Sequence, residues 1–279
     1  MNTYDYETIT VDMSDGIAWV TFNRPDQRNA MSPELHAEME DALDRLEFDD
    51  AAKVVVFSGA GGNFSAGQDL KKFFRANEGK PQEQRRAGRI ANRWRWERIY
   101  SYDKPTIAMV EGYCVGGAFM QLLAADFAIA AEDATFSLAE VNWGIIPGAL
   151  VAKAVTDTVL FRHALYYCCL GEPFDGKEAE KVGMVNFAVP QSELRAKTID
   201  LAQRLMKKSP ATLRATKQCV RHVRTMDYVQ AYEYLAAKGV SARVGDKEDS
   251  YNSGLQQFLE KSYKPAEGEA FKLKDGAKG

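Results

Sequence analysis

The sequence is poor in the residues that crosslink chains or bind metals. It has four cysteines and three histidines among 279 residues. No two cysteines show the CxxC spacing and the histidines lie far apart along the chain, so the pattern predicts neither a disulfide framework nor a metal site. Cys168 and Cys169 lie in an apolar run, and we expect them to be reduced thiols of the core.

The sequence also lacks long apolar runs and a strong charge of either sign. No apolar stretch approaches the roughly 18 residues of a membrane span. The first residues have neither the basic nor the apolar region of a signal peptide, so we expect a cytoplasmic protein. A formal net charge of −3 gives no general attraction to nucleic acid or to anionic membranes, and we expect neither as a partner.

Strand patterns and helix patterns alternate over the first 190 residues, and 46% of the chain is hydrophobic, enough for a sizeable core. Residues 9–22 form a predicted β-hairpin, and Ser32 precedes an amphipathic helix over 33–47. Buried strands are expected at 53–57 and 106–110, and further strands at 127–130 and 185–189. This order predicts an α/β fold with crossover connections and a parallel sheet.

After Pro190 only helical patterns follow, near 191–208, 210–223, 227–243 and 249–261. We therefore predict a core over 1–190, a helical region over 191–265 that caps the core or joins subunits, and a loose polar tail over 266–279.

Two glycine loops each follow a predicted buried strand. Ser65–Asp69 contains Gly67, and Gly116 and Gly117 follow the strand 106–110. Ligands gather at the carboxyl ends of strands in α/β sheets, and loop N–H groups there can stabilise a carbonyl oxygen as it becomes negative. Either loop alone is also explained as a tight turn. Their joint occurrence favours an oxyanion hole.

Glu140 follows shortly after the second glycine loop, among apolar neighbours. Such a glutamate could cap a helix or pair with an arginine. Alternatively, apolar surroundings would raise its pKa into a range useful for proton transfer. An acid beside an oxyanion hole points to enolate chemistry on an acyl group, most naturally a thioester.

Residues 82–101 are rich in arginine at helical spacing. This segment could bind phosphate or RNA, but the interleaved acids Glu83 and Glu97 favour a solvated face whose arginine stems cover apolar surface. The arginines are Arg85, Arg86, Arg89, Arg93, Arg95 and Arg98.

The chain resembles the crotonase, or enoyl-CoA hydratase/isomerase, superfamily over nearly its whole length. The resemblance rests on Ser65-Ala-Gly-Gln-Asp-Leu70, Gly112-Tyr-Cys-Val-Gly-Gly117 and Ala139-Glu-Val…Gly-Ile-Ile-Pro-Gly148. Strings such as Trp94-Arg-Trp96 and Val141-Asn-Trp-Gly144 are most similar to the hydroxycinnamoyl-CoA hydratase-lyases within it.

The resemblance implies a (ββα)n spiral core that binds acyl-CoA and a C-terminal helical oligomerisation region. It implies no cofactor beyond the coenzyme A moiety of the substrate, and assembly as a homotrimer or a dimer of trimers. Gln68 and Gly117 would donate the two oxyanion N–H groups, and Glu140 would be the acid/base. The implied CoA contacts are Arg28 and Ala66, with Phe258 and Lys261 of a neighbouring subunit.

Three positions depart from the superfamily pattern. Met120 stands where simple hydratases have a second glutamate and hydratase-lyases have a serine. Phe73 and Ala236 stand where the lyases have tyrosines that read a substrate phenol. Another tyrosine could substitute, or the acyl group lacks a para-hydroxyl. The residues expected around the acyl group are Phe73, Tyr113, Phe119, Met120, Trp143, Tyr234 and Ala236, and Tyr232 is a further candidate.

The first functional hypothesis is hydration of an aryl-substituted enoyl-CoA followed by retro-aldol cleavage to an aromatic aldehyde and acetyl-CoA. The second is an enoyl-CoA hydratase or double-bond isomerase without cleavage, since an isomerase needs only one acid/base. The third is an RNA-binding or scaffold protein that uses the arginine-rich helix, against which the intact loops and Glu140 argue.

Overall fold

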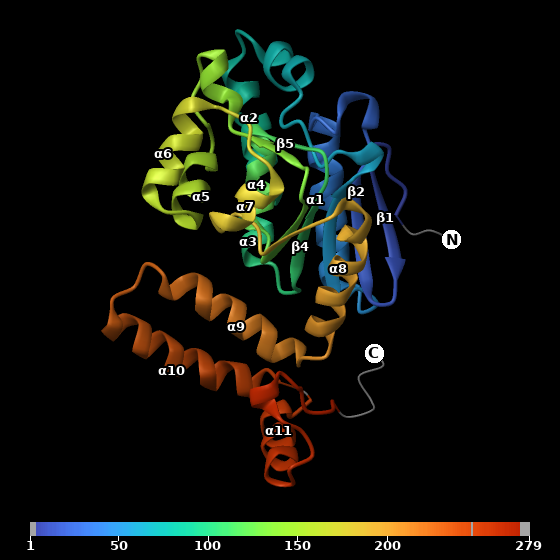
Figure 1. The fold of residues 1–279 in the computed structure, drawn as a ribbon, viewed down its shortest axis with the longest axis vertical. Coiled ribbons are helices and arrows are strands. Elements are labelled where there is room, and N and C mark those ends of the chain that lie inside the picture. The colour runs from blue at the N-terminus through green and yellow to red at the C-terminus, as the bar shows by residue number, and fades with distance from the viewer. Residues whose placement is uncertain (1–3, 247, 274–279) are drawn as a thin grey trace. The chain divides into compact units, whose positions relative to one another are not determined.

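The computed structural model describes residues 4–246 and 248–273 (Figure 1). By its contacts the chain divides into two compact units. The first comprises Met1–Tyr102 with Thr106–Asp200, and the second Asp103–Pro105 with Leu201–Gly279. All strands of the described chain belong to the first unit, and the second is helical.

The first unit contains a six-stranded sheet with the order β1-β2-β3-β4-β6-β8. β1 and β2 are an antiparallel hairpin and all other neighbours are parallel, as the sequence predicts. The strands are β1 (Ile9–Ser14), β2 (Ile17–Phe22), β3 (Val54–Gly59), β4 (Thr106–Val110), β6 (Phe127–Ala131) and β8 (Phe187–Val189). The α/β prediction is confirmed.

The sequences of the two central strands, β3 and β4, do not alternate between apolar and polar residues. Every residue of β3 and of β4 is buried, because a parallel sheet is covered on both faces. Helix α1 (Pro33–Phe48) provides part of this cover. It begins as predicted, with the Ser32 hydroxyl accepting a hydrogen bond from the Leu35 N–H and with Pro33 in the first turn.

A second sheet of two short parallel strands, β5 (Tyr113–Val115) and β7 (Thr135–Ser137), lies next to the glycine loops in sequence. Three residues are too few to show a period, so the sequence pattern did not predict these strands. α5 (Val151–Thr158) follows the loop after β7. The next two helices, α6 (Phe161–Leu170) and α7 (Gly176–Lys181), were also missed.

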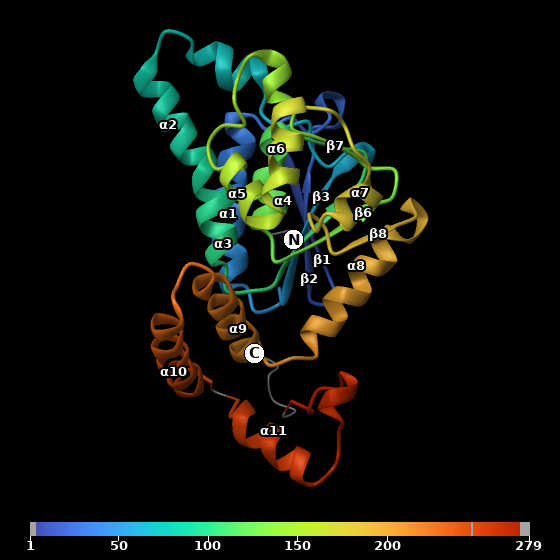
Figure 2. The ribbon, with the colours of Figure 1, turned by 60° about the vertical axis from the view of Figure 1, so that its left-hand side comes forward.

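The arginine-rich segment is not one uniform solvated helix. α2 (Pro81–Asn92) exposes Arg85, Arg86 and Arg89, but a π-helical turn (Arg93–Arg98) follows before α3 (Ile99–Ser101). The wider turn changes the helical phase, and Arg95 is turned inward with only 3% exposure. The prediction of a solvated face is therefore wrong for Arg95. α2 and this turn pack against α1 (Figure 2).

The C-terminal helices follow the predicted spans closely. They are α8 (Gln191–Met206), α9 (Pro210–Val223), α10 (Tyr228–Val244) and α11 (Ser250–Leu259). α9 packs on α10, and α10 starts with a capping box between Asp227 and Gln230. Apolar side chains remain exposed along α10, among them Tyr228, Tyr232 and Val244.

All four cysteines are free, but only Cys114 is buried. Cys168 is half-buried and Cys169 is exposed, so the expectation of two core thiols is wrong. Their apolar run forms α6, and a helix turns successive residues to different faces, so not all of them can point inward.

Within the described residues, no helix combines the length and the hydropathy that crossing a membrane requires. Over the same residues, no cluster of three or more histidine, cysteine, aspartate or glutamate side chains is arranged to hold a metal ion.

Candidate active site

The loop after β3 is pinned between two other segments. The Ser65 N–H donates to the Tyr113 carbonyl at 2.8 Å and the Met31 N–H donates to the Gly67 carbonyl at 2.7 Å. Gly67 has φ +89°, and a Cβ there would lie 2.7 Å from the Val115 carbonyl oxygen and 3.3 Å from the Gly117 nitrogen. Only glycine permits this backbone and this close approach.

The second loop follows β5 and turns at Gly116, which has φ +54°. Gly117 is in a single 3-10 turn, Gly116–Ala118, that leads into α4 (Phe119–Ala124). A Cβ on Gly117 would lie 3.3 Å from the Gln68 Cγ and 3.7 Å from the Gln68 backbone nitrogen. The two loops that follow β3 and β5 therefore meet at Gly67, Gln68 and Gly117.

The backbone N–H groups of Gln68 and Gly117 do not donate to any carbonyl of the described chain. Their neighbours do donate: the Gly67 N–H to the Ser65 hydroxyl and the Asp69 N–H to the Met31 carbonyl. Backbone donors in a protein interior normally have partners. Two donors left without one on adjacent loops are available to a ligand oxygen.

Glu140 comes to the same place from the loop after β7. A Cβ on Gly116 would lie 3.1 Å from the Glu140 Oε1. The Glu140 Oε2 is buried and has no hydrogen-bond partner in the described chain. Burial raises the pKa of Glu140, opposed only by a backbone hydrogen bond. Among the described residues Glu140 therefore neither caps a helix nor forms an ion pair, and one of its carboxyl oxygens is left without a partner.

The loop that carries Glu140 is anchored at its far end. The Asn142 side chain donates to the Gly171 carbonyl at 3.1 Å, and Ser137 donates to the same oxygen at 3.2 Å. Gly171 ends α6 with φ +62°. The acid therefore lies on a short helical turn tied to a neighbouring helix, which limits how far the carboxylate can move.

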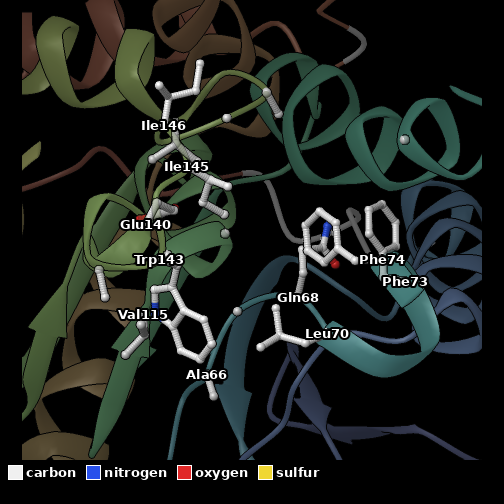
Figure 3. Close-up of a pocket in the computed structure, with 18 of the residues that line it drawn as sticks. Ala66, Gln68, Leu70, Phe73, Phe74, Val115, Glu140, Trp143, Ile145 and Ile146 are labelled. Atoms are coloured by element: carbon white, nitrogen blue, oxygen red, sulfur yellow. The ribbon is translucent and has the colours of Figure 1, made fainter. Parts of the chain in front are cut away.

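A cavity of about 410 Å³ opens beside these groups. In Figure 3, Gln68, Leu70, Phe73 and Phe74 lie across it from Glu140 and Trp143, with Ile145 and Ile146 beyond. Among the described residues that line it, Glu140 is the one carboxylic acid. The wall is otherwise mostly aromatic and aliphatic carbon, which suits an apolar acyl group.

The structure brings together six of the residues expected at the site, and others lie elsewhere. The cavity is lined by Ala66, Gln68, Phe73, Gly117, Glu140 and Trp143. Phe119 and Met120 are fully buried in α4 and are not on its wall. Arg28 and Tyr113 are stacked on each other, with the guanidinium 4.7 Å from the ring centroid, outside the lining set. The second unit carries Tyr234, Ala236, Phe258 and Lys261.

A buried group behind Gln68 was missed by the sequence analysis. The Trp94 indole N–H donates to the His36 Nδ1 at 2.9 Å, and the His36 Nε2 lies 2.8 Å from the Gln68 side-chain amide. Burial, with the nearby Arg95 charge, lowers the pKa of His36 to about 3, so the ring is neutral. Arg95 itself lines the cavity. Only the Trp94-Arg-Trp96 string hinted at these residues.

Comparison with known proteins agrees with this arrangement. The sequence model of the enoyl-CoA hydratase/isomerase family matches residues 12–268. The chain belongs to this family. A hydroxycinnamoyl-CoA hydratase-lyase of Pseudomonas fluorescens is 47% identical over 269 residues, which cover 95% of this chain and 98% of that relative. A probable enoyl-CoA hydratase of Bacillus subtilis is 33% identical, covering 94% and 99%.

Solved structures of the family have the same fold. The enoyl-CoA hydratase of Bacillus anthracis matches with a TM-score of 0.83 and 29% identity, covering 91% of this chain and 97% of that one. The resemblance to the crotonase superfamily and the predicted crotonase fold are thereby confirmed. The protein is accordingly an enzyme of the enoyl-CoA hydratase/isomerase family.

Proposed function

We propose that the protein is an acyl-CoA hydratase-lyase that acts on an aryl-substituted enoyl-CoA. The observation that carries the proposal is the Glu140 carboxylate, buried against Gly116 with an unpartnered oxygen, next to the free N–H groups of Gln68 and Gly117. The 47% identity to the Pseudomonas fluorescens hydratase-lyase supports the same reading.

In the first stage, water adds across the Cα–Cβ double bond. Glu140 accepts a proton from the water as its oxygen bonds to Cβ, and then returns a proton to Cα. The thioester oxygen gains negative charge in between, and the N–H groups of Gln68 and Gly117 stabilise it. The product is the β-hydroxyacyl-CoA, and Glu140 ends as a carboxylate.

In the second stage, Glu140 removes the proton of the β-hydroxyl group. The Cα–Cβ bond breaks, its electrons pass to the thioester, and the aldehyde leaves. The remaining acetyl-CoA enolate takes the proton from Glu140 at Cα. One acid and one pair of donors serve both stages because each stage builds negative charge on the same oxygen.

Cleavage-free hydration or double-bond isomerisation is the second candidate. One carboxylic acid lines the cavity among the described residues, and an isomerase requires only one. Met120 is buried in α4 and supplies neither a second acid nor a hydroxyl. The two candidates differ in whether an aldehyde appears.

The CoA and subunit contacts belong to the same proposal. Ala66 lines the cavity and its N–H donates to the Arg28 carbonyl at 2.8 Å, so the two residues expected to contact CoA within one subunit are neighbours. Phe258, near the end of α11, and Lys261, just after it, would close over CoA bound to a neighbouring copy. The exposed apolar side chains of α10 suit burial in a trimer or a dimer of trimers.

Incubation with cinnamoyl-CoA and its ring-substituted analogues tests the reaction. We expect equal amounts of an aromatic aldehyde, trapped as a hydrazone, and acetyl-CoA, measured by an enzyme-coupled assay. A hydrated product without aldehyde would favour the second candidate. Cinnamoyl-CoA has no γ-hydrogen, so an isomerase is tested separately with an alkyl 3-enoyl-CoA, and its conversion to the 2-enoyl isomer without hydration or cleavage would favour that activity.

The wall of the cavity predicts a preference for aryl over alkyl substrates. We expect kcat/KM for cinnamoyl-CoA to exceed that for crotonyl-CoA by about 10-fold or more, because a ring buries several more carbons against Phe73, Phe74 and Ile145. Trp143→Ala should reduce this ratio, since it removes an exposed indole from the mouth of the cavity. Equal values for both substrates would contradict an aryl-binding wall.

A further inference from the structure

Arg95 is a permanent charge buried beside the proposed oxyanion hole. Its side chain donates from Nε to the Ala91 carbonyl at 2.8 Å, from Nη2 to the Asn92 Oδ1 at 3.0 Å and from Nη1 to the Gly117 carbonyl at 3.2 Å. None of these acceptors is a carboxylate. Burial lowers the pKa of Arg95 to about 10, so the guanidinium stays charged at neutral pH.

A buried charge without a counter-charge is costly, so its retention needs a reason. The neighbouring arginines in the same segment are paired or exposed: Arg93 forms an ion pair with Glu40 at 2.9 Å, and Arg89 is exposed on α2. Arg95 differs from both because it lines the cavity. Its charge therefore acts on the cavity, since no carboxylate of the described residues forms an ion pair with it.

The guanidinium and the hole share one small region. A Cβ on Gly117 would lie 3.2 Å from the Arg95 Nη1 and 3.7 Å from the Gln68 backbone nitrogen. Arg95 also contacts the loop directly through the Gly117 carbonyl. A displacement of this side chain would move the Gly117 loop relative to the Gln68 loop.

The Gln68 side chain lies between Arg95 and His36, and too many donors surround it. The amide has one group 2.8 Å from the His36 Nε2 and the other 3.2 Å from both Arg95 Nη atoms. Because the Trp94 indole can only donate, the neutral His36 carries its proton on Nε2. If the amide oxygen faces His36, the amide N–H groups face Arg95. If it faces Arg95, one amide N–H donates to the Met31 carbonyl at 3.1 Å and the other faces the His36 N–H.

In either orientation one donor opposes another, so the region has more N–H groups than acceptors. Such a surplus attracts a negatively charged oxygen. We propose that Arg95 is a positioning residue of the oxyanion hole: it holds the Gly117 loop against Gln68, and its uncompensated charge favours the enolate oxygen. This inference rests on the proposed function only in that a thioester oxygen binds at Gln68 and Gly117.

The test measures how strongly the protein polarises the bound thioester carbonyl. A residue with only a structural role would not change this polarisation as long as the variant folds normally. The absorption of cinnamoyl-CoA moves to longer wavelength when its carbonyl is polarised, and the spectrum is taken with Glu140→Gln protein to prevent turnover. We expect this shift to be at least halved when Arg95→Met is added. Arg95→Lys should restore part of it, because lysine keeps the charge but lacks the planar guanidinium group. Arg89→Met is the matched control and should leave the shift unchanged.

Kinetics provide the second readout. Arg95→Met alone is expected to lower kcat about 10- to 100-fold with a much smaller change in KM, since it misplaces and weakens transition-state donors. If Arg95→Met does not fold, the same comparison uses Arg95→Lys and Asn92→Ala. The second variant removes the side-chain acceptor of the Arg95 Nη2. An unchanged shift and an unchanged kcat in folded variants would overturn the role of Arg95.

The outcome is separable from that of the proposed reaction. A shift that depends on Arg95 in a protein that forms no aldehyde would leave this inference standing and reject the hydratase-lyase. Aldehyde formation with a shift that ignores Arg95 would do the reverse.

Discussion

Replacing Glu140 with glutamine is expected to lower kcat about 100-fold or more, because it removes the group that moves protons in both stages. Glutamine has nearly the same shape, so the cavity and the two amide donors remain. Affinity for acyl-CoA should therefore change little. Steady-state kinetics with cinnamoyl-CoA and a separate binding measurement check both parts. A variant with near-normal kcat would remove Glu140 from the mechanism.

The pH dependence gives an independent check. The base must be ionised to accept a proton from water, and burial raises the pKa of Glu140. The acid limb of the pH–rate profile should therefore lie above the value of about 4.3 typical of a free glutamate. The residual activity of Glu140→Gln should lack this limb.

A loss of fold would not explain the loss of rate. A carboxyl group whose pKa is raised by folding contributes stability at pH values below its unfolded pKa, and this contribution is lost as pH rises through the folded pKa. At neutral pH the buried carboxylate of Glu140 therefore lowers stability. We expect Glu140→Gln to melt at or above the temperature of the wild-type protein at pH 7, by thermal denaturation.

The elements that could be predicted from sequence are those with a long period or a clear start signal. α1 follows from Ser32-Pro33 and an apolar stripe, and β3 and β4 from continuous apolar runs. β5 and β7 could not be predicted because they are three residues long and exist only by pairing with each other. Arg95 was misplaced because helical spacing assumes a constant turn, and the π-helical turn breaks it.

The part of the candidate site that could be predicted from sequence is the part where the backbone conformation requires a particular residue type. Gly67 and Gly116 require glycine because of their positive φ, so the loops are visible in the sequence. Arg95, His36 and Trp94 occupy positions where the backbone does not require a particular residue type, so the sequence does not show that they belong together. These side chains come from α1 and the turn after α2, and they meet only through tertiary packing. Residues that act from behind the site therefore need the structure.

Replacing Gly117 with alanine is expected to lower kcat about 100-fold, because alanine keeps the backbone N–H but its methyl group displaces that donor from the Gln68 loop, and a misplaced oxyanion donor counts as a lost one. The φ of Gly117 is not positive, so the backbone accepts alanine and the protein should fold. The new methyl group would lie 3.2 Å from the Arg95 Nη1 and 3.3 Å from the Gln68 Cγ, in the space between the two donors. Gly239→Ala is the control, because a Cβ there meets nothing within 4 Å.

Binding of two analogues separates a lost donor from a blocked cavity. A thioether analogue of the substrate has a methylene group in place of the carbonyl and cannot use the hole. If Gly117→Ala acts on the hole, its affinity for a thioester product falls while its affinity for the thioether stays near the wild-type value. If the methyl group only obstructs the cavity, both affinities fall together. Calorimetry with both ligands distinguishes the two results, and the second would mean that the loss of rate reflects an obstructed cavity and not a disturbed oxyanion hole.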